Sequence, residues 1–108
     1  MAVAEVFRAL GDPVRLEMVQ RLTRREAATI SVVSEGLGIT RQGARKHLQV
    51  LADSGVVRLE PHGREVAVRL DAERLESARI FIEEMERRWD TRLDALKRFV
   101  EEEGGQNG

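Results

Sequence analysis

The 108-residue chain is long enough for one modest hydrophobic core, and nothing in its length argues for a second domain. Charged residues make up 34% of the chain and aromatic residues only 4%, a balance typical of helix-rich proteins with aliphatic cores. The absence of cysteine excludes disulfides and thiolate metal ligands, and no apolar run approaches the roughly 20 residues needed to span a bilayer. Because the start lacks a signal-peptide pattern, we expect a cytoplasmic protein that does not enter a membrane.

Charge is distributed unevenly along the chain. The net charge is −1, but residues 41–70 carry six basic groups against three acidic ones, and residues 71–108 carry seven against eleven. Phosphate binding depends on the local field of the surface presented to it, not on the total charge. A basic face that binds nucleic acid, formed by the middle of the chain, is therefore compatible with a net charge close to zero.

Two short amphipathic helices are predicted in the first quarter of the chain. The first is indicated by apolar residues at helical spacing, namely Val3, Val6, Phe7 and Leu10. Gly11 ends this run, and Asp12 followed by Pro13 is a strong start signal for a second helix, which we expect to continue to about Arg25.

The next segment has the layout of a helix-turn-helix. A short third helix is expected after a cap at Thr29 or Ser31, and Thr40 is the N-cap of a fourth helix that should end at Gly55. The apolar face of the fourth helix consists of Ala44, Leu48, Leu51 and Ala52. In a helix-turn-helix the second helix enters the DNA major groove.

A β-hairpin and a long helix complete the predicted fold. Residues 56–60 and 65–70 are short β-branched runs joined by a turn at 61–64, and this hairpin would be a two-stranded wing. After a cap at Asp71, apolar residues recur every three or four positions at Leu75, Ala78, Ile82, Met85, Trp89, Leu93, Leu96 and Val100. The pattern leaves open a break near Trp89. Unbroken, the helix would span roughly 45 Å, so part of its stripe needs another chain.

We therefore predict a mainly α, winged helix-turn-helix protein with a long C-terminal dimerisation helix. The DNA-binding and dimerisation domain should cover residues 1–103, and the apolar-free residues 104–108 should be a disordered tail.

The polar face of the fourth helix is the candidate DNA contact. It comprises Arg41, Gln42, Arg45 and Lys46, close to the cap at Thr40. Arginine can donate two hydrogen bonds to guanine and glutamine can pair with adenine. Most charged helix faces are merely solvated, but here the flanking turn and wing favour DNA. For His62 and Arg64 at the hairpin, contact with DNA and an ordinary polar turn both remain open.

The sequence offers little support for a catalytic site or a metal-binding site. His47 borders the apolar stripe and is expected to be a packing residue. The acidic cluster of Glu83, Glu84 and Glu86 has basic neighbours and suggests a solvated helix face. The two histidines lack metal spacing, so we expect no enzyme activity, no cofactor and no metal.

Along essentially its whole length the chain resembles ArsR/SmtB-type transcriptional repressors. The resemblance is carried by FRALGDPVRLEMVQRL, by LGITRQGARKHLQVLADSGVV and by HGREVAVRL. Val32 and Val33 stand where many metal sensors of the family carry cysteines, so the chain looks closer to the metal-independent branch.

The resemblance implies a homodimer on a pseudopalindromic operator, where it blocks transcription until an effector, here an unidentified small molecule, weakens DNA binding. The first and last helices would form the dimer interface, with Val3, Val6, Phe7, Leu75, Ala78, Ile82, Met85 and Trp89. A winged-helix module that binds another protein without contacting duplex DNA is the rival interpretation, because fold alone does not decide function.

Overall fold

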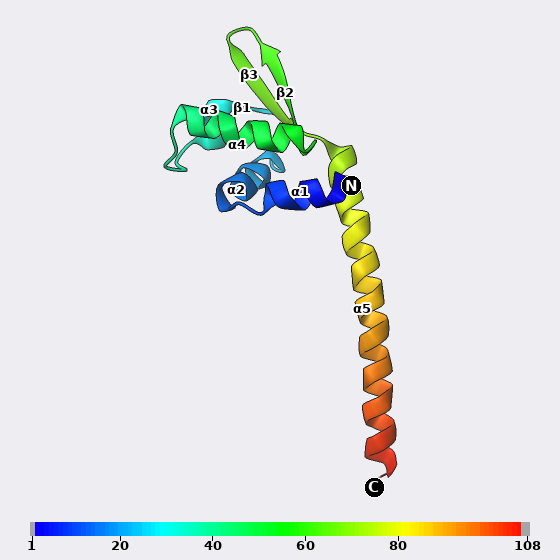
Figure 1. Cartoon of the computed structure of the whole chain (residues 1–108). Helices are drawn as coiled ribbons and strands as arrows, with labels where there is room; N and C mark the ends of the chain where they lie inside the picture. The colour runs from blue at the N-terminus through cyan, green and yellow to red at the C-terminus, as the bar shows by residue number, and fades with distance from the viewer. Residues whose placement is uncertain (1, 107–108) are drawn as a thin grey trace. The chain divides into compact units, whose positions relative to one another are not determined.

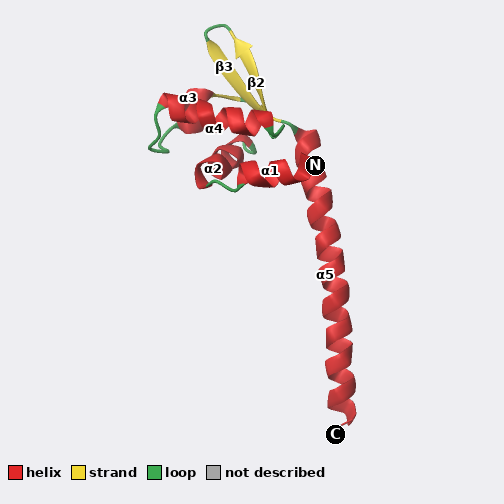
Figure 2. Cartoon of the chain, viewed as in Figure 1, coloured by secondary structure: helices red, strands yellow, loops and turns green. Residues whose placement is uncertain are grey.

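The computed structural model describes residues 2–106 (Figure 1). Its elements in chain order are α1 (Ala2–Leu10), α2 (Pro13–Leu22), β1 (Ala28–Thr29), α3 (Ile30–Ser34), α4 (Arg41–Asp53), β2 (Val57–His62), β3 (Glu65–Leu70) and α5 (Ala72–Gln106). The chain divides into two compact units, one ending at Ala78 and the other beginning at Arg79. Figure 2 shows a mainly helical protein with one β-hairpin, which confirms the predicted fold class.

The helices of the first unit begin at the predicted caps. Asp12 Oδ2 accepts hydrogen bonds from the backbone N–H groups of Val14, at 2.9 Å, and Arg15, at 3.0 Å. Thr40 caps α4 in the same way, and of the two candidates for α3 the structure selects Thr29. Side-chain oxygens thus satisfy donors that a helix start leaves free.

The second helix is shorter than predicted. It ends at Leu22 instead of about Arg25, because Thr23 forms its C-cap and Thr23 Oγ1 donates to the carbonyl of Gln20 at 2.6 Å. A threonine side chain that bonds to the backbone competes with helix continuation.

The wing is a hairpin within a sheet of three strands, in the order β1-β3-β2. β2 and β3 pair antiparallel up to His62 opposite Glu65, so the connection is a two-residue turn at Gly63 and Arg64, with Gly63 at a φ of +66°. The predicted turn at 61–64 is therefore two residues too long. The sequence prediction of a two-stranded wing did not include the third strand, β1, whose Ala28 pairs with Val68 of β3. Two residues are too few for strand alternation to be recognised.

The core of the first unit is built from aliphatic side chains of the helices and of the sheet. Its buried members are Val6, Ala9, Met18, Val19, Leu22, Val33, Ala44, Leu48, Leu51, Val56, Val57, Val68 and Ala78. Val6 is 0% exposed and Ala78 is 5% exposed, so both side chains already pack against other residues of their own chain. Their place in a dimer interface stays a prediction, because helical spacing identifies an apolar face without saying what covers it.

The last helix is continuous through Trp89 and ends at Gln106. It extends three residues past the predicted domain end at 103, since glycine disfavours a helix by only about 1 kcal/mol and helix ends are the least predictable positions. Residues 107 and 108 of the predicted tail lie outside the described residues. From position 80 onward all nine large apolar side chains of this helix are 41–60% exposed.

Among residues 2–106 there is no helix long and apolar enough to cross a membrane.

The cap at Asp12 gives an expected pH dependence of stability. The hydrogen bond from the Arg15 N–H, aided by the positive charge of Arg15, holds the pKa of Asp12 below its ordinary value of 3.8. The charged carboxylate therefore stabilises the fold above pH 3.8, and this contribution is lost as the pH falls through the lowered pKa. Asp12→Asn keeps a capping oxygen but removes the charge.

We expect Asp12→Asn to be less stable than the native protein near neutral pH, and the two to converge at pH values well below 3.8. Urea unfolding of both proteins across this range is the measurement. A stability difference that stays constant with pH would contradict a role for the charge.

Candidate nucleic-acid interface

The fourth helix has one buried face and one exposed face. Ala44, Leu48 and Leu51 are completely buried in the core, which anchors the helix. The predicted contact residues Arg41, Gln42, Arg45 and Lys46 are all exposed. Because α4 is held by its apolar face, its first two turns present amide and cationic groups to solvent in a fixed orientation.

The start of α4 and the turn of the wing meet around a small hollow. Arg41 and Arg45 of α4 line it together with Arg64 of the wing turn. The remaining lining residues are Thr29, Ile30, Ser31, Glu65 and Val66. The hollow holds only about 40 Å³, far below the roughly 300 Å³ at which small-molecule sites begin. It is therefore a surface contact point and not a ligand pocket.

The three guanidinium groups at this hollow are uncompensated. Among residues 2–106, Arg41, Arg45 and Arg64 find no partner for an ion pair or a side-chain hydrogen bond, and Glu65 is the one carboxylate among the lining residues. Like charges at one place repel each other, so this arrangement is favourable when polyanionic groups lie against it. Sequence analysis predicted each of the three arginines, and the structure brings them together from two elements.

The other predicted contact residues lie outside the hollow. Gln42 and Lys46 are exposed on α4, and His62 is exposed at the end of β2. Thr40 has a structural task, since its hydroxyl oxygen accepts from the Gly43 N–H at 2.9 Å. A side chain at Gly43 would place a Cβ 3.2 Å from Thr40 Oγ1, so the glycine leaves room for this cap.

A polar cluster behind the exposed face of α4 was missed by sequence reasoning. His47 Nδ1 lies 3.3 Å from Nη1 of Arg15 and 3.8 Å from Oδ2 of Asp12. Arg15 also donates through Nε to the carbonyl of Ala9 at 2.7 Å. His47 is half-buried, and its partner Arg15 carries no sequence signal because 32 positions separate the two residues.

The described residues contain no group of three or more histidine, cysteine or acidic side chains that could hold a metal ion. The acidic cluster on α5 is exposed, and Glu83 forms an ion pair with Arg79.

A helix-turn-helix whose second helix is capped and exposed, followed by a hairpin that carries a cation to the same hollow, defines the winged helix-turn-helix class of DNA-binding proteins. The model of a family described as helix-turn-helix domain matches residues 10–60. The HTH-type transcriptional repressor SmtB of Mycobacterium tuberculosis is 36% identical over 69 residues, which cover 64% of this chain and half of that repressor.

Two solved structures extend the similarity. An ArsR-like transcriptional regulator from Rhodococcus sp. RHA1 is 33% identical with a TM-score of 0.73, covering 91% of this chain and 92% of that one. A homodimeric winged helix-turn-helix DNA-binding domain from Mycobacterium bovis, described as that of a possible ArsR-family regulator, is 26% identical with a TM-score of 0.63; the match covers 75% of this chain and 72% of that one. The chain belongs to the ArsR/SmtB family of winged helix-turn-helix transcriptional regulators, which are DNA-binding proteins and not enzymes.

Proposed function

We propose that this protein is a transcriptional repressor that binds a pseudopalindromic operator as a homodimer. The observation that carries the proposal is the meeting of Arg41, Arg45 and Arg64 at one hollow between α4 and the wing. Two elements that are separate in the sequence direct cations to the same place, as contact with the groove and the backbone of one duplex requires.

Within this interface, the chemistry of each side chain suits it to contact either the bases or the phosphates. Arg45 and Arg41, in the first two turns of α4, are suited to donate to guanine O6 and N7, and Gln42 is suited to adenine. Lys46, Arg64 and His62 would contact phosphates, which position the protein without reading sequence. The Thr40 hydroxyl, already an acceptor in the cap, can still donate to a phosphate oxygen.

The dimer is proposed from the exposed stripe on α5. Its members follow one another at steps of three or four residues and comprise Ile82, Met85, Trp89, Leu93, Leu96 and Val100. Their exposed fractions of 45–60% are high for large apolar side chains, and a continuous apolar stripe on a helix is ordinarily covered by another helix. A second copy of α5 offers a matching stripe, and the solved domain from M. bovis is described as homodimeric.

Residues of the first unit would complete this interface. Val3 and Leu75 are half-buried and Phe7 is 36% exposed, so each retains some surface for a partner. A twofold dimer presents two copies of α4 to the duplex, which places the half-sites about 10 base pairs apart or at a multiple of that spacing.

The rival function, a winged-helix module that binds a protein, is distinguished by the salt dependence of DNA binding. An interface that neutralises phosphates releases counterions, so affinity for a random duplex should fall steeply with salt. DNA binding that is absent or insensitive to salt would favour the rival.

Removing the Arg45 side chain tests the reading of sequence. We expect Arg45→Ala to weaken binding to an operator selected from a random duplex pool by about 1 to 3 kcal/mol, with little change in folding because the side chain is exposed. Fluorescence anisotropy measures the affinity for the operator and the affinity for random DNA.

Arg98→Ala is the matched control, since it removes the same charge from an exposed position of α5. The control should bind operator as the native protein does. If Arg45→Ala lowers affinity equally for operator and random DNA, Arg45 contacts a phosphate and reads no base.

A further inference from the structure

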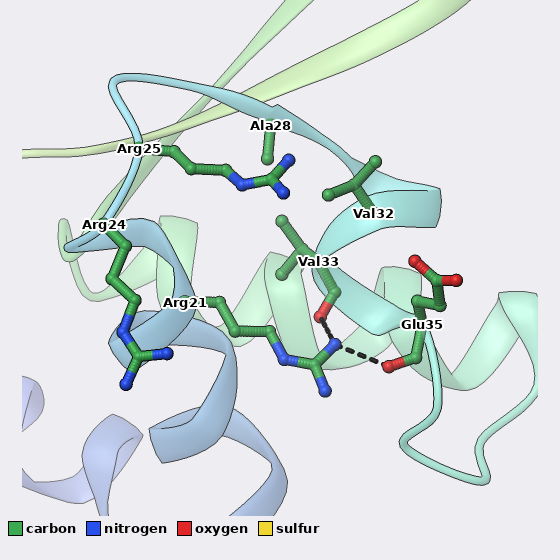
Figure 3. A pocket seen from close by; sticks show the side chains of 7 residues that line it. All are labelled: Arg21, Arg24, Arg25, Ala28, Val32, Val33 and Glu35. Carbon is green, nitrogen blue, oxygen red and sulfur yellow. Dashed lines mark hydrogen bonds between the residues drawn. The ribbon is translucent and has the colours of Figure 1, made fainter.

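A second concave site lies between the end of α2 and α3, away from the DNA-facing hollow. Its volume is about 310 Å³, within the range of small-molecule sites. The lining consists of Arg21, Arg24, Arg25, Ala28, Val32, Val33 and Glu35 (Figure 3). It shares no residue with the hollow at Arg41, Arg45 and Arg64.

One of its three arginines is fixed by the protein itself. Arg21 Nη1 donates to the carbonyl oxygens of Val33, at 3.0 Å, and Glu35, at 2.6 Å, and Arg21 Nε donates to Glu17 at 3.3 Å (Figure 3). This guanidinium joins α2 to the end of α3. It is therefore a rigid wall of the pocket whose hydrogen bonds are largely used.

The other two arginines have no such task. Within the described residues 2–106, the side chains of Arg24 and Arg25 make no hydrogen bond or ion pair. Arginine side chains often donate hydrogen bonds to the free carbonyl groups at a helix end. Here the carbonyl groups of Gln20, Arg21 and Leu22 already accept hydrogen bonds from the backbone N–H groups three residues further along the chain. Capping of α2 does not account for these two side chains.

The opposite wall of the pocket is apolar. Its accessible part is formed by Ala28 and Val32, which are half-buried, whereas Val33 is fully buried in the core. In Figure 3 the Arg25 guanidinium reaches across the pocket toward Ala28 and Val32. A cation beside an apolar wall suits a ligand that has a charged end and a hydrophobic body.

We propose that this pocket binds a small organic anion, a carboxylate with a short apolar body. The carboxylate lies against Arg25, and the body covers Val32 and Ala28. Arg21 is paired with Glu17, so Arg24 and Arg25 against the carboxylate of Glu35 leave an excess of one positive charge in the lining. An arginine fork matches a carboxylate with two parallel hydrogen bonds. A DNA phosphate would use the cations but leave the apolar wall without a partner.

Titration of the free protein, without DNA, tests the site independently of the proposed repressor function. The probes are hexanoate, hexylamine and inorganic phosphate, and the readout is calorimetry together with backbone amide chemical shifts. We expect hexanoate to bind saturably at millimolar concentration and to shift the amides of residues 21–35. Hexylamine should not bind, and phosphate should bind more weakly than hexanoate.

Variants of Arg25 provide the matched comparison. Arg25→Gln should weaken hexanoate binding roughly tenfold or more, Arg25→Lys should retain part of it, and Arg8→Gln, an equal loss of charge on α1, should bind as the native protein does. Circular dichroism of each variant establishes that it is folded. The proposal is overturned if hexanoate does not saturate, if hexylamine or phosphate binds as well, or if Arg25→Gln binds like the native protein.

Discussion

Replacing Ile82 and Met85 together with glutamate is expected to convert the protein into folded monomers that no longer bind the operator tightly. Both side chains belong to the exposed stripe of α5, at 45% and 53% exposure, so the substitutions remove nothing from the core of the first unit. In a dimer, however, they would bury four carboxylates without partners. Leaving a buried charge without a partner costs about 3 to 5 kcal/mol, which weakens dimerisation by roughly two to four orders of magnitude.

Loss of the dimer acts on DNA binding through the linkage of the two half-sites. When one copy of α4 is bound, the second faces its half-site at a high effective concentration, so affinity can exceed that of one half-site by roughly 10² to 10⁴. We expect the operator affinity of the monomer to be lower by a factor of this size. Light scattering reports the mass, and footprinting on the same variant reports whether both half-sites are protected.

The matched control places the same two charges on the other side of the helix. Thr91 is nine residues from Ile82, which at about 100° per residue is half a turn round the helix, and Ala95 lies one turn further along. Thr91→Glu with Ala95→Glu should remain dimeric and bind the operator normally. A folded Ile82→Glu, Met85→Glu monomer that still protects both half-sites with native affinity would refute the dimer mechanism.

Local signals predicted most of the elements that carry the DNA-facing residues. Asp12, Thr29 and Thr40 are caps because their side-chain oxygens satisfy free N–H groups of the next few residues, and that chemistry is readable within a window of four positions. The exposed arginines of α4 follow from the same window, since the apolar stripe defines the opposite face.

Features that depend on distant partners were not predictable in this way. The strand β1 exists because Ala28 and Thr29 find unpaired groups on β3 some 40 positions later. The contact of Arg15 with His47 has the same origin. Local patterns give the faces of elements, whereas packing decides which face meets which partner.

The residues predicted for the dimer interface illustrate the same limit. Val6 and Ile82 are both apolar residues at helical spacing, yet Val6 is buried in its own unit and Ile82 is 45% exposed. Periodicity records that a face needs cover but does not say whether the cover belongs to the same chain.

Leu48→Ala on α4 is expected to cause a large loss of stability. Leu48 is 0% exposed and belongs to the core cluster, and a buried leucine replaced by alanine loses about 2 to 5 kcal/mol through lost burial and the remaining cavity. Small domains are stable by only about 5 to 15 kcal/mol. Urea unfolding followed by circular dichroism should therefore show a much lower midpoint with an unchanged slope.

Val50→Ala is the control, because Val50 lies on the same helix but is 40% exposed. It should change stability by no more than about 0.5 kcal/mol. Measurements of operator affinity distinguish the role of the buried face of α4 from that of its exposed face. At a temperature where Leu48→Ala is still folded, its affinity should stay near the native value, whereas Arg45→Ala loses affinity without losing stability. If Leu48→Ala weakens operator binding as much as Arg45→Ala does while remaining fully folded, the core face of α4 also sets the position of the recognition residues, and the two faces do not act separately.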